Sequence, residues 1–141
     1  MSDSGRTVVL DSEGLSLVAG KDADILAFLS FARRYRNRVV VPTAVLAEVI
    51  TGRASDAQVW HAVNRLVTQD ITRDIAGEAG ALRERAEEVR AKKKDLTVDA
   101  MVAAVARQFA PSVVLTCDVE DLKLLCEGAN VVVRHPREAR L

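Results

Sequence analysis

Short apolar runs alternate with longer amphipathic stretches along the whole chain. Five apolar runs predict strands, at residues 7–10, 39–41, 69–72, 113–115 and 131–133, of which the third is weak. Apolar residues at helical spacing predict helices over residues 23–35, 44–51, 56–66, 75–93, 98–109 and 119–126. Strands that are separated by helices pair in parallel through right-handed crossovers. The pattern therefore predicts an α/β fold, a three-layer α/β/α sandwich around a central parallel sheet of about five strands.

Two of the predicted helices carry signals at their ends. Thr43 is a good N-cap for the helix at 44–51, and Gly52 is a good residue to end it. The long polar helix at 75–93 ends in a basic cluster, which suits the negative end of its dipole. There is no repeat, low-complexity tract or obvious linker. The 141 residues leave no room for a second core of useful size, so one domain, 1–141, is expected.

Composition and charge exclude several classes of protein. With 49% hydrophobic and 28% charged residues, the chain is neither disordered, collagen-like nor a disulfide scaffold. The 20 basic residues balance the 20 acidic ones, so net charge does not argue for a nucleic-acid or membrane partner. The start of the chain lacks the features of a signal peptide, and the longest apolar run is too short to span a bilayer. A cytoplasmic protein is expected, with Cys117 and Cys126 as reduced thiols, a disulfide being the minor alternative.

Acidic residues follow the predicted strands closely. Asp11 comes directly after the first strand, and Asp118 follows the fourth strand after two residues. The second strand leads into the helix that carries Glu48, and Asp99 opens the helix before the fourth strand. Ligands of open parallel sheets bind beyond the carboxyl ends of the strands. All four carboxylates can therefore reach one edge of the sheet.

Each acid also has a simpler explanation. Asp11 alone is explained as a loop or cap residue, Asp99 as an acid favoured by a helix dipole, and Asp118 and Asp121 as caps of the following helix. Glu48 is harder to explain in this way, because it lies beside the apolar stripe of its helix and not opposite it. Four acids that converge on one sheet edge favour a functional site over four separate structural roles.

Crowded carboxylates point to a divalent metal. They repel one another when ionised, and a cation relieves that cost. Hard oxygen donors with few histidines favour Mg²⁺ or Mn²⁺ over zinc, and these ions suit hydrolysis of a phosphodiester. Without the five candidate acids, the chain keeps 15 acidic against 20 basic residues, a surround that suits a polyanionic substrate. The basic clusters at 33–38 and 92–94 are more simply solvated faces than substrate contacts.

Four segments in order resemble the PIN domain family, and within it the VapC-type toxins of bacterial toxin–antitoxin pairs. They are VVLDS at 8–12, PTAVLAEV at 42–49, TVDAMVAAVA at 97–106 and LTCDVEDL at 115–122. The resemblance covers nearly the whole chain and implies a metal-dependent ribonuclease with a five-stranded parallel sheet. It implies that Asp11, Glu48, Asp99 and Asp118 are catalytic, the first, third and fourth of them as metal ligands. Thr116 and Asp121 match positions that support the same site.

The resemblance also implies partners. It predicts a homodimer and a cognate antitoxin whose C-terminal segment blocks the cleft. The helices between residues 23 and 66 carry apolar side chains beyond what a small sandwich needs, notably Phe28, Phe31, Trp60 and Val63. Part of this face is expected to form the dimer, with an antitoxin helix in a neighbouring groove.

A few residues depart from the family pattern or are not placed by it. Glu13 is an extra acid two residues after Asp11, which is either a benign surface residue or perturbs metal binding. Trp60 is expected in the core or in the dimer interface, and His61 and His135 on the surface.

The sequence thus predicts an endoribonuclease that uses Mg²⁺ or Mn²⁺ and leaves 3′-hydroxyl and 5′-phosphate ends. A catalytically silent PIN-like domain that binds RNA or protein is the alternative, but such a domain would be free to lose one of the acids. A phosphohydrolase of another α/β family lacks support, because Asp11 has no second Asp at the spacing that an aspartyl-phosphate mechanism needs. Transfer, ribosomal and messenger RNA all remain compatible with the sequence as substrates.

Overall fold

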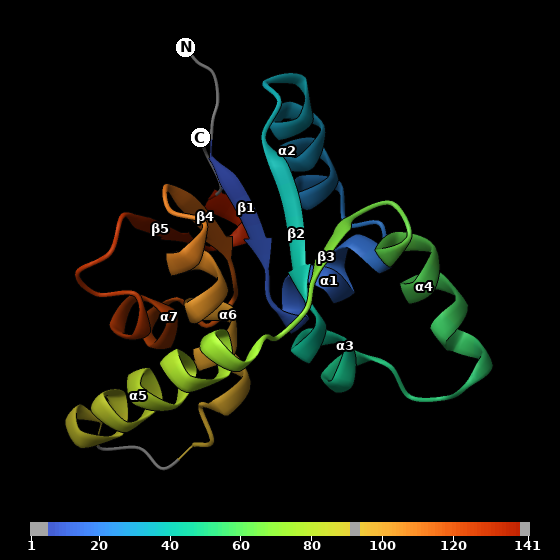
Figure 1. Ribbon diagram of the computed structural model, residues 1–141. Coiled ribbons are helices and arrows are strands. Elements are labelled where there is room, and N and C mark those ends of the chain that lie inside the picture. Colours follow the sequence, from blue (N-terminus) through green and yellow to red (C-terminus); the bar gives the residue numbers. More distant parts are fainter. Residues whose placement is uncertain (1–5, 91–93, 139–141) are drawn as a thin grey trace.

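A parallel β-sheet forms the centre of the computed structural model, which describes residues 6–90 and 94–138 (Figure 1). Its five strands lie in the order β3-β2-β1-β4-β5, and all pair in parallel. The strands are β1 (Thr7–Leu10), β2 (Arg38–Pro42), β3 (Val67–Gln69), β4 (Ser112–Leu115) and β5 (Val131–Arg134). The α/β class, the parallel sheet and the number of strands predicted from the sequence are confirmed.

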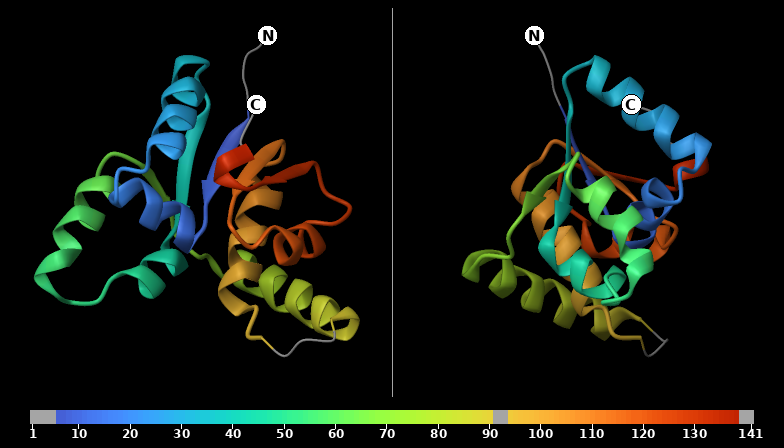
Figure 2. Two further views of the ribbon diagram at one scale, coloured as in Figure 1. Left: turned by 180° about the vertical axis from the view of Figure 1, so that it is seen from behind. Right: turned by 90° about the vertical axis from the view of Figure 1, so that its right-hand side faces the viewer.

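Helices cover both faces of the sheet. The helices are α1 (Ser12–Ala19), α2 (Ala23–Arg34), α3 (Thr43–Val49), α4 (Ala57–Val63), α5 (Arg73–Val89), α6 (Thr97–Gln108) and α7 (Val119–Leu125), with short 3₁₀ turns at Ala54–Asp56 and Pro136–Glu138. Helix α1 packs against α2, α3 and α4, whereas α5, α6 and α7 pack against one another. Figure 2 shows these two groups on opposite sides of the sheet, which makes the three-layer sandwich.

The strand order reverses direction between β1 and β4. The chain builds the sheet outward from β1 to β3, and α5 and α6 then carry it back to place β4 on the other side of β1. Such a reversal opens a crevice at the carboxyl ends of the two central strands. Leu10 of β1 lies opposite Leu115 of β4, so the residues that follow them, Asp11 and Thr116, emerge side by side at this crevice.

The core is built around the two central strands and α6. Val8, Val9 and Leu10 of β1 are fully buried, as are Val113, Val114 and Leu115 of β4, because helices cover both faces. In α6 the buried positions are mostly alanine and valine, which let the helix pack closely on the sheet. The first turn of α6, which carries Asp99, is thereby fixed against the crevice.

Several predicted boundaries are corrected by the structure. Helix α1 is not predicted from the sequence, because Asp11 is explained there as the acid that follows a strand, whereas it is also the N-cap of this helix. Strand β3 forms at Val67–Gln69 and not at 69–72, since an edge strand pairs on one side only and its sequence signal is weak. The prediction of α5 extended to residue 93, but residues 91–93 lie outside the described part; α5 itself begins earlier, at Arg73, with Thr72 as its cap.

The predicted ends of α3 are also wrong. Pro42 is the N-cap and Thr43 is the first helical residue, so its side chain does not cap the helix. The Thr43 hydroxyl instead accepts a hydrogen bond from the backbone N–H of Ile71, 3.2 Å away, and thereby ties α3 to the segment after β3. Ile50 ends the helix, and Gly52 lies in the next turn with a φ of 81°, a conformation that favours glycine.

Among residues 6–90 and 94–138, no helix combines the length and the apolar character that crossing a bilayer requires.

Candidate functional site

A cleft of about 420 Å³ opens where the central strands end. All four carboxylates predicted from the sequence line it, although they come from four separate segments of the chain. The lining residues are Asp11, Ser12, Glu13, Glu48, Lys94, Asp95, Val98, Asp99 and Asp118. The structure thus brings together side chains that are up to 107 positions apart in the sequence (Asp11 to Asp118).

Asp11 combines a structural and a candidate functional role. It follows β1 and caps α1, and its Oδ1 accepts a hydrogen bond of 2.8 Å from the backbone N–H of Gly14. The side chain is nearly inaccessible, and burial raises the pKa of Asp11 to about 6, although hydrogen bonds from Thr116 and Gly14 act in the opposite direction. Asp11 is therefore held in place by these bonds, and its pKa lies well above the ordinary value for aspartate.

Thr116 fixes the turn after β4. It is completely buried, and its Oγ1 accepts a hydrogen bond of 2.8 Å from the backbone N–H of Asp118. Its own backbone N–H donates to the carbonyl of Arg134 in β5, 3.0 Å away. These bonds hold the chain in the turn that presents Asp118 to the cleft.

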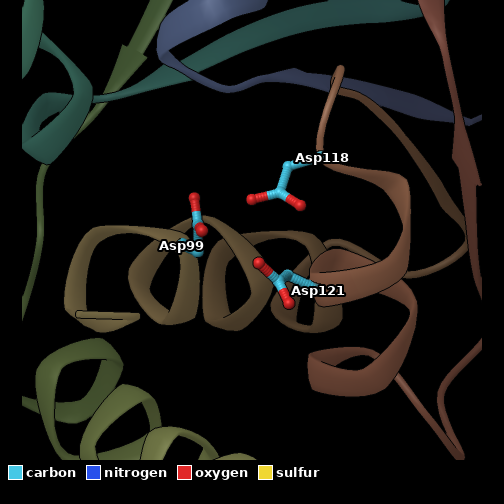
Figure 3. Close-up of side chains that lie close together, drawn as sticks. All are labelled: Asp99, Asp118 and Asp121. Carbon is cyan, nitrogen blue, oxygen red and sulfur yellow. The ribbon is translucent and has the colours of Figure 1, made fainter. Parts of the chain in front are cut away.

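Three carboxylates converge closely enough to share one cation. Asp99 lies in the first turn of α6, Asp118 at the start of α7, and Asp121 in the first turn of α7. One oxygen from each lies within 4.8 Å of the others (Figure 3). We call these three residues the acidic cluster. The side chain of Asp118 makes no capping hydrogen bond, so the cap explanation considered from the sequence does not apply to it.

The acids of the cluster affect one another's ionisation. Burial raises the pKa of Asp99 to about 6, an effect that Lys94 opposes and that the negative charges of Asp118 and Asp11 reinforce. For Asp118, hydrogen bonds from Lys94 and Asp121 outweigh burial and lower the pKa. For Asp121, burial and the neighbouring Asp118 raise the pKa. The cluster therefore carries charge that a cation would stabilise.

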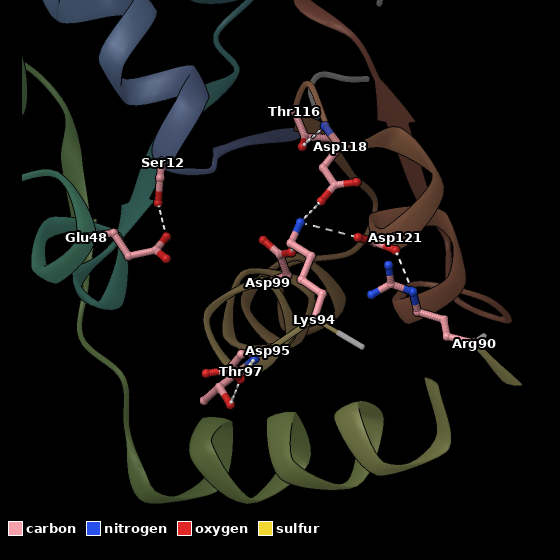
Figure 4. A network of polar contacts seen from close by, with 10 residues as sticks. All are labelled: Ser12, Glu48, Arg90, Lys94, Asp95, Thr97, Asp99, Thr116, Asp118 and Asp121. Carbon is pink, nitrogen blue, oxygen red and sulfur yellow. Dashed lines mark hydrogen bonds and ion pairs between the residues drawn. The ribbon is translucent and has the colours of Figure 1, made fainter. Parts of the chain in front are cut away.

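Two basic side chains balance part of this charge. The Lys94 ammonium forms an ion pair with Asp118 and also lies 3.4 Å from Oδ2 of Asp121 and 3.7 Å from Oδ2 of Asp99 (Figure 4). These contacts, led by the hydrogen bond with Asp118, raise the pKa of Lys94 above its usual range. On the other side, Nε of Arg90 lies 3.2 Å from Oδ1 of Asp121. The basic residues therefore approach different oxygens of the same carboxylate.

Glu48 lies across the cleft from the acidic cluster. It is an exposed residue of α3, and one of its carboxylate oxygens accepts a hydrogen bond from the hydroxyl of Ser12 in α1. Figure 4 shows Glu48 and Ser12 on one side of the cleft and the acidic cluster on the other. The site therefore has three clustered carboxylates on one side and a separate carboxylate on the other.

The donor set fits Mg²⁺ or Mn²⁺. It consists of carboxylate oxygens, which hard divalent cations prefer. Asp99, Asp118 and Asp121 each offer one oxygen within 4.8 Å of the other two, so the cluster supplies three such donors to a single ion. Both cysteines, Cys117 and Cys126, are free thiols, and neither belongs to the acidic cluster.

Some expectations for residues outside the cluster are revised. Trp60 is 45% exposed, so it is not a core residue, and the dimer interface stays the prediction for it. Phe28 and Val63 belong to the core and not to an exposed face. Glu13 lines the cleft, while neither histidine does. Of the basic cluster at 92–94, residues 92 and 93 lie outside the described part, and Lys94 is in the site.

Sequence reasoning missed three contributors to the site. Ser12 holds Glu48, Arg90 pairs with Asp121, and Lys94 pairs with the whole acidic cluster. Ser12 could have been noticed next to Asp11, but no local pattern distinguishes Arg90 and Lys94 from other basic residues after a helix. The structure also groups Asp121 with Asp99 and Asp118, and Asp11 is not among these three.

Comparisons with known proteins agree with this architecture. The complex "VapBC2 from Rickettsia felis bound to a DNA fragment from their promoter" contains a chain with a TM-score of 0.70 and 16% identity, over 92% of this chain and 98% of that one. A chain of "FitAB bound to IR36 DNA fragment" has a TM-score of 0.66 and 16% identity, over 95% and 98%. "FitAcB from Neisseria gonorrhoeae" has a TM-score of 0.59 and 16% identity, over 92% and 97%. These similarities describe the fold.

The sequence itself settles the family. No curated protein is significantly similar to the chain. Residues 8–126, however, match the pattern of the PIN domain, a span that includes most of β1, the acidic cluster and Glu48. The chain belongs to the PIN domain family.

Proposed function

We propose that this protein, acting as one domain over residues 1–141, is a metal-dependent endoribonuclease and the toxin of a toxin–antitoxin pair. The observation that carries the proposal is the cleft that gathers Asp11, Glu48, Asp99 and Asp118 from four segments. Membership of the PIN domain family and the likeness in fold to chains of VapBC2 and FitAB complexes support it. A bacterial cytoplasm is the expected place of action.

The proposed reaction is hydrolysis of an RNA phosphodiester. Water adds to phosphorus, the bond to the 3′-oxygen breaks, and the departing oxygen takes up a proton, which leaves a 3′-hydroxyl and a 5′-phosphate. When bound, Mg²⁺ or Mn²⁺ polarises the phosphate oxygens and lowers the pKa of the attacking water. Asp99 and Asp118 would hold the ion together with Asp121, whose carboxylate lies beside theirs. Asp11, which lines the same cleft, would complete the surroundings of the ion.

The remaining residues of the site would position these groups. Thr116 and the Gly14 N–H orient Asp11, so its carboxylate is already in place before substrate binds. Glu48, held by Ser12 across the cleft, would accept a proton from the water or orient it. Arg90 keeps Asp121 oriented from the side away from Lys94.

We propose that the antitoxin binds a second surface, a hollow between α1, α2 and α4, in addition to the cleft. This hollow has a volume of about 560 Å³, and it has an apolar floor that includes Leu26 and Leu29. Lys21, Arg33 and Arg65 line it, and no acidic residue does. An amphipathic helix with acidic flanks would suit such a groove.

The nuclease proposal is tested with purified protein and total RNA in Mg²⁺ or Mn²⁺, with and without chelator. Asp11→Ala, Glu48→Ala and Asp99→Ala should each lower the cleavage rate by about a hundredfold or more, which is the scale for loss of a principal electrostatic group. Asp121→Ala should have an effect of the same order as Asp99→Ala, because both belong to the acidic cluster. Glu120→Ala, an exposed acid in the same turn of α7, is the matched control and should cleave normally.

Two results would contradict the mechanism. Cleavage that persists in chelator, or in Asp11→Ala combined with Asp99→Ala, would mean that another site or a contaminant is responsible. Absence of cleavage together with tight RNA binding would favour the silent PIN-like domain. Growth arrest on expression of the wild type but not of Asp11→Ala supports the toxin assignment only together with the cleavage assay.

A further inference from the structure

The acidic cluster already contains a positive charge supplied by the chain. Nζ of Lys94 approaches Oδ2 of Asp99, Asp118 and Asp121, so its ammonium lies among the same three carboxylates that come within 4.8 Å of one another. A Lys ammonium has three donors, and here it faces three acceptors. The position of this ammonium is therefore also the position that one divalent ion would take in the cluster.

We infer that Lys94 is a tethered competitor of the divalent ion: its ammonium occupies the metal position of the metal-free protein and must leave when the ion binds. This inference rests on the proposed metal site and adds the residue that sets its affinity. The apparent affinity of a site falls in proportion to the fraction of molecules in which the site is open. A cation that is attached to the chain is present at a constant, high local concentration.

Lys94 differs from Arg90 in its freedom to move. The side chain of Lys94 is 49% exposed, whereas that of Arg90 is 14% exposed and has a buried Nη1 without a hydrogen-bond partner in the described structure. Lys94 can swing into solvent without uncovering the core, and its ammonium is well hydrated there. Arg90 stays in place and continues to pair with Oδ1 of Asp121, the oxygen that Lys94 does not approach.

The difference in charge also favours replacement of the Lys94 ammonium by a divalent ion. The ammonium contributes one positive charge to a cluster of three carboxylates, and a divalent ion contributes two at shorter distances, about 2.1 Å for Mg²⁺ against about 2.8 Å for a charged hydrogen bond. The ion therefore wins when its concentration is sufficient. In a chelated sample, Lys94 keeps the carboxylates together and limits their repulsion.

The experiment measures Mn²⁺ binding directly, by electron paramagnetic resonance of free Mn²⁺, on full-length protein that has been stripped with chelator. Lys94→Met removes the charge but keeps most of the apolar stem. Lys94→Arg keeps the charge. Lys123→Met removes one positive charge from an exposed position of α7, outside the cleft, and is the matched control.

Lys94→Met is expected to bind Mn²⁺ about tenfold more tightly than the wild type, which corresponds to about 1.4 kcal/mol. Lys94→Arg and Lys123→Met should remain within about twofold of the wild type. Thermal unfolding provides a second readout. Without metal, Lys94→Met should melt at a lower temperature than the wild type, because three carboxylates lose their counter-charge. Its rise in melting temperature with saturating Mn²⁺ should be larger.

Other results overturn the inference in distinguishable ways. Equal Mn²⁺ affinity of Lys94→Met and the wild type would refute competition while the metal site stands. Weaker binding by Lys94→Met would mean that Lys94 supports the site instead of competing for it. If neither protein binds Mn²⁺, the metal site of the proposed function fails, and the inference fails with it.

Discussion

At the scale of single residues, the site depends on carboxylates that are both buried and crowded. Asp11 is 3% exposed, and Asp99 has a side chain that is 19% exposed. Burial raises the pKa of each to about 6, well above the ordinary value for aspartate. Carboxylates of this kind destabilise the fold when they are ionised without a partner. A bound cation stabilises their ionised forms, and this favours binding of the cation.

The first prediction concerns pH. Folded Asp11 and Asp99 hold protons up to about pH 6, whereas the unfolded chain releases them near pH 4, so their contribution to stability is present in acid and is lost as pH rises through about 6. Metal binding needs the charged forms, so it should change in the opposite direction. Mn²⁺ affinity should fall by about tenfold or more between pH 7 and pH 5, measured by titration calorimetry. A flat profile would mean that neither carboxylate titrates on binding.

The second prediction concerns the metal ligands. Mg²⁺ or Mn²⁺ should raise the melting temperature of the wild type, because a ligand that binds only the folded state stabilises it. Asp99→Asn and Asp118→Asn should remove most of this rise, since each takes one charged donor from the acidic cluster. Asp95→Asn is a suitable comparison, because Asp95 lines the cleft but uses its carboxylate to bind Thr97. An undiminished metal response in both cluster variants would place the metal elsewhere.

At the scale of elements, the turn from β1 into α1 holds Asp11 against β4. Gly14 allows this close approach: a Cβ at this position would lie 3.2 Å from the carbonyl oxygen of Leu115 and 3.4 Å from Oδ1 of Asp11. The Leu115 carbonyl belongs to the central strand β4 and has little room to move. The absence of a side chain at Gly14 therefore lets α1 pack closely against both β4 and Asp11.

The third prediction compares two glycines in helices. Gly77→Ala in α5 has open space around it and should raise stability by about 0.5–1 kcal/mol, since alanine favours the helix more than glycine does. Gly14→Ala has the same intrinsic gain but must displace Asp11 or β4. It should therefore show no gain or a net loss of stability, and a smaller rise in melting temperature with Mn²⁺. Equal gains in both variants, by thermal and urea unfolding, would show that the site around Gly14 is not tight.

At the scale of the whole molecule, the layer of α1 to α4 keeps apolar side chains exposed. Leu26 and Phe31 of α2, Tyr35 directly after α2 and Trp60 of α4 are between 40% and 57% exposed. The ring centroids of Phe31 and Tyr35 lie 4.7 Å apart. Exposed aromatic side chains are common in protein interfaces. Two of the apolar residues predicted for this face, Phe28 and Val63, are instead in the core, so the exposed set is smaller than the sequence suggested.

The fourth prediction is the homodimer. The wild type should sediment as a dimer at micromolar concentration, and Trp60→Ala should shift it toward monomer by removing a large apolar contact. Trp60 is the one tryptophan of the chain, so its emission should move to longer wavelength as the dimer is diluted. Val89→Ala removes an exposed apolar side chain from α5, in the other layer, and should change nothing. A wild type that stays monomeric at all concentrations would contradict the prediction.

The sequence by itself determined the class of fold, and it was enough to identify the four carboxylates that line the cleft. Buried parallel strands need continuous apolar runs, and the helices between them need apolar residues at helical spacing, so both patterns are visible locally. The acids that follow those strands could be identified for the same reason. Edge strand β3 and helix α1 were misplaced or missed, because their local signals were weak or were assigned to another role.

Only the tertiary structure decided which of these elements are neighbours. The order β3-β2-β1-β4-β5 places β4 beside β1 and so brings Thr116 to Asp11, which no local pattern encodes. The same arrangement adds Asp121 to the acidic cluster and brings Lys94 among its carboxylates. Strand order and ion pairing depend on the burial and electrostatics of segments far apart in the chain, whereas sequence periodicity reports only on each segment by itself.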